Sequence, residues 1–144
     1  MYKRQDFVSG AAEWLSPANA AGHWDLIEGQ GSLFHPSYAA VTLGLIHGSQ
    51  PDALVLCHET GRRHIGNLPD YPIPSFGRCM DVYLQAARLT NPAGRFVGIA
   101  LNTASCDEAA ARRAIEAAAN ETGLPCTDAL RFGCEAIVTA MEDI

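Results

Sequence analysis

"RFVGIALNT", residues 95–103, is an apolar run bounded by an arginine and by polar residues. It has the length of a strand, and a run without polar alternation predicts a strand that is covered on both faces. A second run of this kind is "DALVLC", residues 52–57. Strands buried on both faces are typical of parallel sheets in α/β proteins, so these two runs decide the fold class.

Other elements alternate with these two runs. "WDLIEG" predicts a further strand at residues 24–28, and "LPCTD" predicts a short one at residues 124–128. Helices are expected from Asp6 to about Pro17, at 37–48 with Gly48 as the C-terminal cap, at 76–89, at 106–123 and around 134–141. We therefore expect a parallel α/β sheet with helices on both faces. Residues 52–57 and 95–102 should be neighbours, with residues 24–28 on the other side of residues 52–57.

The composition excludes several classes of protein. The chain has 144 residues, 48% of them hydrophobic, and a formal net charge of −6 at pH 7. This length fits one domain, and the negative charge argues against a nucleic-acid partner. No apolar run approaches the roughly 20 residues that span a membrane, and nothing resembles a signal peptide. The five cysteines form no CxxC pair, which favours reduced thiols and a cytoplasmic location.

The first five residues, "MYKRQ", fit no periodic element. They resemble the translated adapter found at the ends of environmental sequencing fragments. We therefore expect residues 1–5 to be a non-native leader, residues 6–144 to be a partial α/β domain, and the natural protein to begin further upstream.

Polar side chains follow each predicted strand. They stand at residues 28–31, 58–59, 102–103 and 127–128. The carboxyl ends of parallel strands meet at one edge of a sheet, and ligands of open α/β sheets bind at that edge. The sequence therefore predicts a binding site made from these four segments.

Glu28 ends an apolar run, where an unpaired carboxylate is costly. It can bind Mg²⁺ as a hard oxygen ligand or act as a general base. It can also accept hydrogen bonds from the amides of its own loop. Gly29 and Gly31 permit close approach of the backbone to a ligand, and a plain tight turn explains them equally well.

All five histidines fall between positions 23 and 64. None shows HxH, HxxxH or HExxH spacing, which argues against a zinc site. His35 precedes Pro36, and His58 follows the run at residues 52–57. Either histidine is a candidate acid–base group, since imidazole titrates near neutral pH.

The proline-rich loop at residues 58–75 is too long for a simple connector, and such loops are usually functional or mobile. Arg62 and Arg63 can hold a substrate carboxylate by bidentate pairing, or form a solvated basic pair. Asn102 can contact an adenine edge or cap the following turn. Cys57 is interpreted as a small core residue, because no basic neighbour that would activate its thiol is evident.

Two short motifs resemble those of dethiobiotin-synthetase-like P-loop proteins. "IEGQG" resembles their strand whose acidic residue faces metal and phosphates, and "GIALNT" resembles their strand whose asparagine contacts the base. More closely, nearly all of residues 6–141 is similar to the C-terminal domain of a bacterial family linked to D-glutamate N-acetyltransferase. The most specific part is residues 28–59, "EGQGSLFHPSYAAVTLGLIHGSQPDALVLCHE".

This resemblance implies a truncated P-loop NTPase-like domain, because the chain lacks a GxxxxGK[ST] phosphate loop and the strand before it. The same protein would also carry an N-terminal Rossmann-like domain. The implied reaction transfers acetyl from acetyl-CoA to an amino-acid amine, and this chain alone should be inactive. The residues implied are His35, His58 or Glu28 as base, Gly29, Gly31 and Asn102 at the cofactor, and Arg62 and Arg63 at the substrate.

Two other functions stay open. One is an ATP-dependent ligase or kinase of the dethiobiotin-synthetase type, with a nucleotide and with Mg²⁺ on Glu28. The other is a nucleotide-binding module without catalysis. A homo-oligomer is compatible with each of these three functions.

Overall fold

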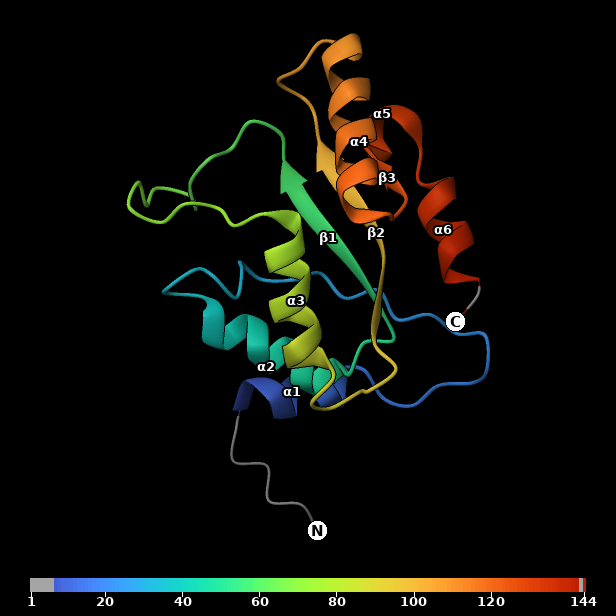
Figure 1. Ribbon diagram of the computed structural model, residues 1–144. Helices are drawn as coiled ribbons and strands as arrows, with labels where there is room; N and C mark the ends of the chain where they lie inside the picture. The colour runs from blue at the N-terminus through green and yellow to red at the C-terminus, as the bar shows by residue number, and fades with distance from the viewer. Residues whose placement is uncertain (1–6, 143) are drawn as a thin grey trace.

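The sheet at the centre of the molecule has three parallel strands in the order β1–β2–β3 (Figure 1). The structure is a computed structural model that describes residues 7–142 and residue 144. β1 spans Ala53–Glu59, β2 spans Arg95–Asn102 and β3 spans Cys126–Thr127. The predicted parallel α/β fold is confirmed, including the direct pairing of the two long apolar runs and the short strand in "LPCTD".

Six helices are found in the described part of the chain. They are α1 (Phe7–Leu15), α2 (Ala39–Ser49), α3 (Phe76–Ala87), α4 (Glu108–Thr122), α5 (Ala129–Phe132) and α6 (Glu135–Met141). All but the four-residue α5 were predicted, with ends that differ by a few residues. The expected leader at residues 1–5 and the expected helix start at Asp6 lie outside the described residues.

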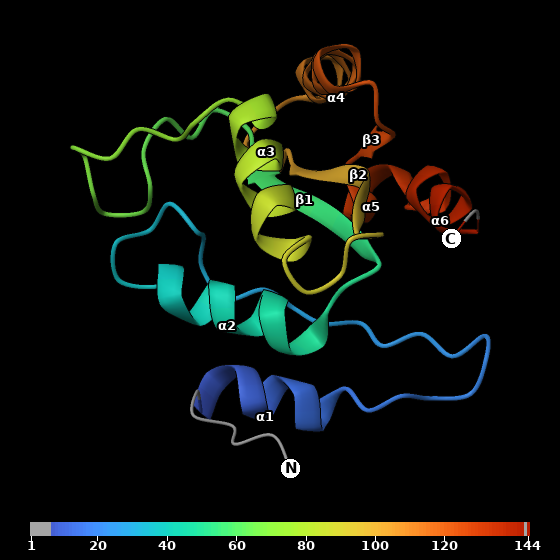
Figure 2. The same ribbon diagram turned by 60° about the horizontal axis from the view of Figure 1, so that its bottom comes forward.

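Helices cover both faces of the sheet, as Figure 2 shows, with α3 and α4 on one side and α6 on the other. On the first face, Ile99 and Leu101 of β2 pack with Ala118 of α4. On the second face, Gly98 touches α6 so closely that a Cβ there would lie 2.7 Å from Cγ1 of Ile137. Both faces of β2 are therefore buried, which explains its unbroken apolar sequence.

α1 and α2 form a separate pair that lies side by side below the sheet in Figure 2. Their contact depends on small residues: a Cβ on Gly48 would overlap the carbonyl oxygen of Ser9. The prediction that Gly48 caps α2 is therefore wrong. The C-terminal cap is Gln50, with a positive φ of 50°. Gly48 is needed earlier in the last turn, because the backbone of α1 passes against it.

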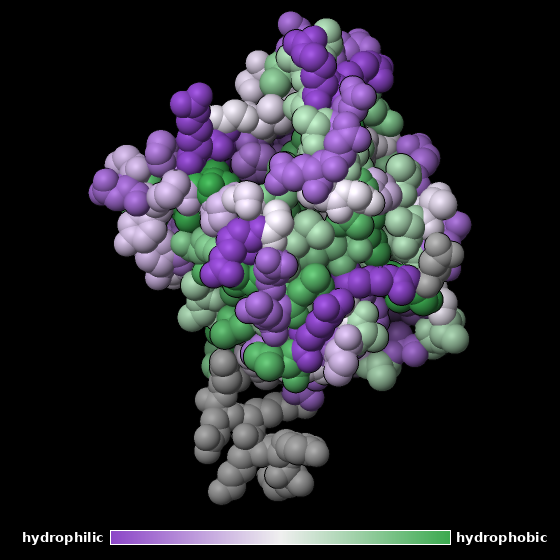
Figure 3. Space-filling view, in the orientation of Figure 1, coloured by the Kyte–Doolittle hydropathy of each residue, from purple (hydrophilic) through white to green (hydrophobic). Residues whose placement is uncertain are grey.

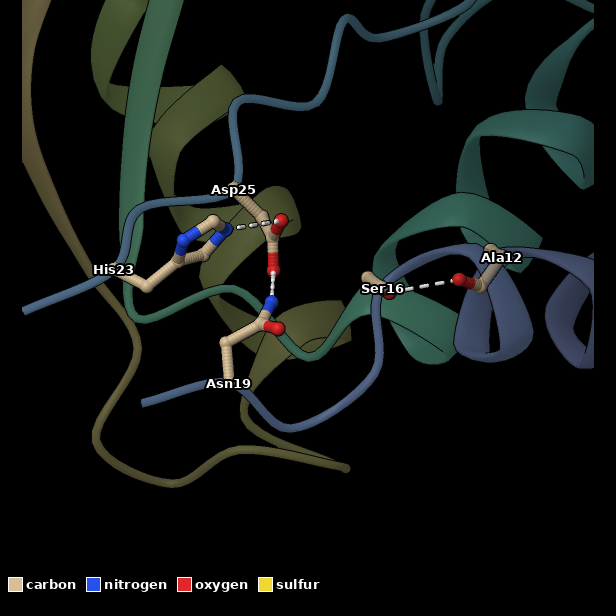
Figure 4. A network of polar contacts seen from close by, with 5 residues as sticks. All are labelled: Ala12, Ser16, Asn19, His23 and Asp25. Atoms are coloured by element: carbon tan, nitrogen blue, oxygen red, sulfur yellow. Dashed lines mark hydrogen bonds and ion pairs between the residues drawn. The ribbon is translucent and has the colours of Figure 1, made fainter. Parts of the chain in front are cut away.

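The strand predicted at residues 24–28 is absent, and the segment is extended and irregular. Asp25 is bound within its own loop, accepting a hydrogen bond from Asn19 Nδ2 at 3.0 Å and pairing with His23 Nε2 at 3.2 Å (Figure 4). Leu26 is 87% exposed, so the apolar run is not covered. A strand requires a hydrogen-bonded neighbour, and no described strand pairs with this segment, which explains the wrong prediction.

Candidate active site

A cleft of about 490 Å³ lies where the loop at residues 31–35, the end of β1, the loop at residues 62–75 and α3 meet. Figure 1 shows the long loop projecting past the arrowhead of β1, which places the cleft at the carboxyl edge of the sheet. In Figure 3 the projecting loop carries mainly hydrophilic side chains, with a hydrophobic patch beside them. Its lining includes Gly31, Ser32, Phe34, His35, Cys57, His58, Glu59, Arg62, Ser75, Phe76, Cys79, Tyr83 and Glu121.

His58 is half-buried in the wall of the cleft. Its ring meets the ring of Phe76 edge to face, with centroids 5.4 Å apart. Burial lowers the pKa of His58 below its ordinary value of 6.5, the positive charge of Arg62 lowers it further, and the negative charge of Glu59 partly opposes both. Within the part of the chain that the structure describes, neither ring nitrogen has a hydrogen-bond partner. His58 is therefore a neutral imidazole at pH 7 with a free lone pair facing solvent or a ligand.

Arg62 brings positive charge to the same cleft. Its guanidinium lies 3.4 Å from the carboxylate of Glu59, an exposed ion pair three residues apart. Such pairs hold the two side chains weakly, so Arg62 can turn toward an anionic ligand at little cost. Arg63 does not line this cleft; it lines an adjacent hollow of about 420 Å³, to which Arg62 also contributes.

His35 also lines the cleft, but its ring is engaged. Its Nδ1 accepts a hydrogen bond from the backbone N–H of Ser37 at 3.1 Å, and its ring lies against that of Tyr38, with centroids 4.4 Å apart. Accepting at Nδ1 requires the neutral tautomer with the proton on Nε2. In this arrangement His35 offers a hydrogen-bond donor to the cleft and no lone pair.

A glycine shapes the near wall of the cleft. Gly31 has a φ of 67°, and a Cβ there would lie 2.7 Å from Cβ of Tyr38. Gly29 has open space around it and does not line the cleft. Of these two positions, only Gly31 requires a glycine for its backbone conformation and for its close contact with Tyr38.

Glu28 does not line the cleft, yet its charge acts on the strand beside it. Burial raises the pKa of the Cys57 thiol, and the negative charge of Glu28 raises it further. Glu28 therefore lies near the carboxyl half of β1, on the side where the sequence placed it. Because the segment is not a strand, its backbone is not held by sheet hydrogen bonds.

The carboxyl ends of β1 and β2 lie together, since Glu59 pairs with Asn102 in the register of the sheet. Asn102 Oδ1 accepts a hydrogen bond from the N–H of Ala104 at 3.0 Å, so this side chain caps the turn that follows its strand. Asn102 is exposed and does not line the cleft.

A buried polar network joins β2 to β3 at this edge. Asp128, only 4% exposed, accepts hydrogen bonds from both the hydroxyl and the N–H of Thr103. These bonds lower the pKa of Asp128, foremost the bond from the Thr103 hydroxyl, against the opposing effect of burial. Arg131 Nη1 donates to the carbonyl oxygens of Thr103 and Cys106, both at 3.1 Å. In the sequence, this network could have been anticipated from the acidic residue that follows "LPCT", which is Asp128.

The described residues contain no group of three or more histidine, cysteine, aspartate or glutamate side chains that could hold a metal ion. Within this part of the chain, Glu28 would therefore share a metal ion with at most one other such side chain. No helix in the described ranges is long and apolar enough to cross a membrane.

The model of one protein family, described as "Domain of unknown function (DUF1611_C) P-loop domain", matches residues 4–138. The chain belongs to this family. Two relatives carry the name D-glutamate N-acetyltransferase. The protein from Tritonibacter scottomollicae is 47% identical over 94% of this chain, and that from a Pseudoalteromonas species is 49% identical over 92% of it.

A crystal structure of a DUF1611 family protein from Anabaena variabilis has the same fold. It is 44% identical to this chain, superimposes with a TM-score of 0.85 and covers 99% of the chain. The chain spans about two fifths of the length of these proteins: 41% and 40% of the two named relatives and 42% of the protein in the crystal. These similarities confirm the family and the P-loop-like α/β fold inferred from the sequence.

Proposed function

We propose that this chain forms part of an acetyltransferase that moves the acetyl group of acetyl-CoA to the amine of an amino acid such as D-glutamate. The observation that carries the proposal is the 47–49% identity, over more than nine tenths of the chain, to two proteins named D-glutamate N-acetyltransferase. The cleft at the carboxyl edge of the sheet supports it, because it combines an unpaired imidazole with a cationic side chain.

His58 is the base favoured by the geometry. The substrate amine attacks the thioester carbonyl carbon, and His58 accepts one proton from the attacking nitrogen. The carbon–sulfur bond then breaks, and the departing thiolate takes that proton from His58. The products are the N-acetyl amino acid and CoA with a free thiol. His35 fits this role less well, since its Nδ1 accepts from Ser37 and its Nε2 carries the proton.

The remaining predicted residues fit around this step as proposals. Arg62 would bind a substrate carboxylate within the cleft, with Arg63 beside it in the adjacent hollow. Gly29, Gly31 and Asn102 would approach the nucleotide part of CoA. Glu28 would assist as a second base or bind Mg²⁺ together with phosphate oxygens. The rest of the protein, expected to include a Rossmann-like domain, would supply the phosphate-binding backbone.

An ATP-dependent ligase or kinase is the second candidate, because the matching family model is described as a P-loop domain. One experiment separates the two. The protein is expressed from its complete gene and incubated with D- or L-glutamate plus either acetyl-CoA or ATP and Mg²⁺.

Acetyl transfer without ATP supports the first proposal, and ATP consumption dependent on the amino acid supports the second. Nucleotide binding without turnover in any mixture would contradict both and indicate a non-catalytic binding module. Residues 6–144 alone should give no turnover, and robust activity of that segment would contradict the expectation that it holds only part of the site.

A further inference from the structure

The far wall of the cleft is formed by one face of α3. Phe76, Cys79 and Tyr83 are spaced three and four residues apart, which places them in a row along the helix, and all three line the cleft. Phe76 touches the ring of His58. Tyr83 lies two turns further on, about 10 Å along the helix axis. A ligand that contacts His58 and follows this row reaches the Tyr83 hydroxyl.

Among residues 7–142 and 144, the Tyr83 hydroxyl has one hydrogen bond, and in that bond it is the acceptor. The backbone N–H of Leu33 donates to Tyr83 Oη at 3.2 Å, which ties the near wall of the cleft to the far wall. A phenol can accept and also donate one hydrogen bond. No acceptor for its hydrogen is found among the described residues, so the donor capacity of this half-buried hydroxyl is unused.

From this arrangement we infer that Tyr83 donates a hydrogen bond to the acyl carbonyl oxygen of the acetyl donor. The inference rests on the proposed acetyl transfer and adds a residue that stabilises the negative charge on that oxygen when the amine attacks. Laid end to end, a base–amine hydrogen bond, a near-attack contact, a carbonyl bond and a second hydrogen bond add up to about 10 Å. Because these contacts are not collinear, that sum is the upper limit of the separation they can bridge, and it is comparable to the offset between Phe76 and Tyr83 along α3. The N–H of Leu33 donates to one lone pair of this oxygen and leaves the hydroxyl hydrogen free for the bond to the acyl oxygen.

The test uses two substitutions that separate the donor role from the loop-holding role. Tyr83→Phe removes the hydroxyl and keeps the ring. Leu33→Pro removes the N–H that donates to Tyr83, at a position suited to proline: it follows Ser32 in the turn closed by the bond from His35 N–H to Ser32 O at 3.0 Å. A residue that merely holds the loop would respond alike to both changes.

Both variants are made in the protein expressed from its complete gene. The kcat for acetyl transfer is measured, together with the binding of acetyl-CoA and of S-ethyl-CoA, a thioether that lacks the carbonyl oxygen. We expect Tyr83→Phe to lower kcat by about 10²-fold, the loss typical of one oxyanion donor. It should weaken the binding of acetyl-CoA, because the hydrogen bond from Tyr83 to the carbonyl oxygen is lost. The binding of S-ethyl-CoA should stay within about twofold, because that ligand has no carbonyl oxygen to accept this bond. Leu33→Pro should keep most of the kcat.

Equal losses in the two variants, or a Tyr83→Phe kcat within about twofold of wild type, would overturn the donor role while leaving acetyl transfer intact. A wild-type protein that transfers no acetyl group would overturn this inference and the proposed function together. The two failures are thus distinguished by the wild-type assay alone.

Discussion

Asp128 and Thr103 are joined by two hydrogen bonds at the carboxyl edge of the sheet: one carboxylate oxygen accepts the Thr103 hydroxyl at 2.6 Å and its N–H at 2.9 Å. The other oxygen accepts the N–H groups of Leu130 and Arg131 at the start of α5. One buried carboxylate therefore fixes the ends of β2 and β3 and the helix that follows.

Replacing this carboxylate should destabilise the fold. Asp128→Asn keeps the shape but loses charge-assisted acceptance, and we expect a loss of about 2 kcal/mol in the free energy of unfolding, measured with urea. Asp107→Asn is the matched control: Asp107 also caps a helix, by accepting from Ala110 N–H at 2.7 Å, but it is exposed. Asparagine caps helices about as well, so the control should change little. If both substitutions lowered the free energy of unfolding equally, burial of the Asp128 carboxylate would not explain its contribution to stability.

The same pair predicts a pH dependence. The pKa of Asp128 is lower in the folded state than its ordinary value of 3.8, so the unfolded chain binds more protons at low pH. The stability that Asp128 contributes is present above that ordinary value and is lost as the pH falls through the folded pKa. The difference between wild type and Asp128→Asn should therefore shrink below about pH 4. A difference that stays constant down to about pH 2 would contradict this assignment.

The pKa of His58 should respond in opposite directions to its two charged neighbours. Arg62→Gln removes a positive charge that lowers the pKa, so the pKa should rise. Glu59→Gln removes a negative charge that raises it, so the pKa should fall further. NMR titration of the His58 ring in the chain measures both. If His58 is the base, the acid limb of the kcat/KM profile should move with these values; a limb that stays in place would exclude His58 from that role.

The position of Glu28 can be tested without any assay of activity. Glu28→Gln should lower the pKa of Cys57, because its negative charge is one of the two causes that raise it. Cys57 should then be alkylated faster by iodoacetamide at about pH 8, followed residue by residue by mass spectrometry. Glu116→Gln, an exposed charge on α4 that is not among the causes acting on Cys57, serves as control. An unchanged rate would place Glu28 away from β1 and argue against its role at the site. In the protein expressed from its complete gene, Glu28→Gln should also lower acetyl transfer while leaving the fold nearly intact.

The contact between α1 and α2 should be sensitive to a single methyl group. Gly48→Ala places a Cβ against backbone atoms of α1, which cannot rotate away, and should cost about 2 kcal/mol in urea unfolding. Gly77→Ala in α3 meets nothing within 4 Å and should stabilise the fold by up to about 1 kcal/mol. Similar changes at both glycines would show that helix propensity, and not the helix contact, decides.

The free edge of β1 predicts self-association of the isolated chain. β1 pairs only with β2 among the described strands, and Val55 on it is 40% exposed. Unpaired edges with apolar side chains pair with other chains, and a lysine there suppresses this. Val55→Lys should reduce association in sedimentation velocity at rising concentration. The control is Val138→Lys, at a valine of α6 that is 47% exposed, and it should leave association unchanged. If both substitutions reduce association, or neither does, the chains do not associate through the edge of β1.

The elements predicted well are those whose signals are local. The run at residues 95–103 is apolar because helices cover both of its faces, and α4 begins at a capping Asp107 and ends at Gly123 with a φ of 70°. The strand predicted at residues 24–28 failed because a strand depends on its neighbour, which no local pattern reveals. The four-residue α5 is too short to show a period.

The lining of the cleft was predicted only in part from the sequence, and the chemical roles of its residues stay predictions. The cleft brings together Gly31, His35, His58 and Arg62, all singled out from the sequence. Tyr83 was not singled out from the sequence, because the hydrogen bond that joins its hydroxyl to the loop at residues 31–35 comes from a backbone N–H fifty residues away along the chain. The spacing of Phe76, Cys79 and Tyr83 on one helix face was the signal that could have found it.

The bond between Leu33 and Tyr83 also determines when the cleft comes into existence during folding. It closes a long loop of chain that includes α2, all of β1 and the loop at residues 62–75, so its entropic cost is met only after those parts have docked. We therefore expect the cleft wall to form late in folding. It should also open before the parallel pairing of β1 with β2 is lost. The amide hydrogen of Leu33 should exchange with solvent through this local opening, well before the amides of β2.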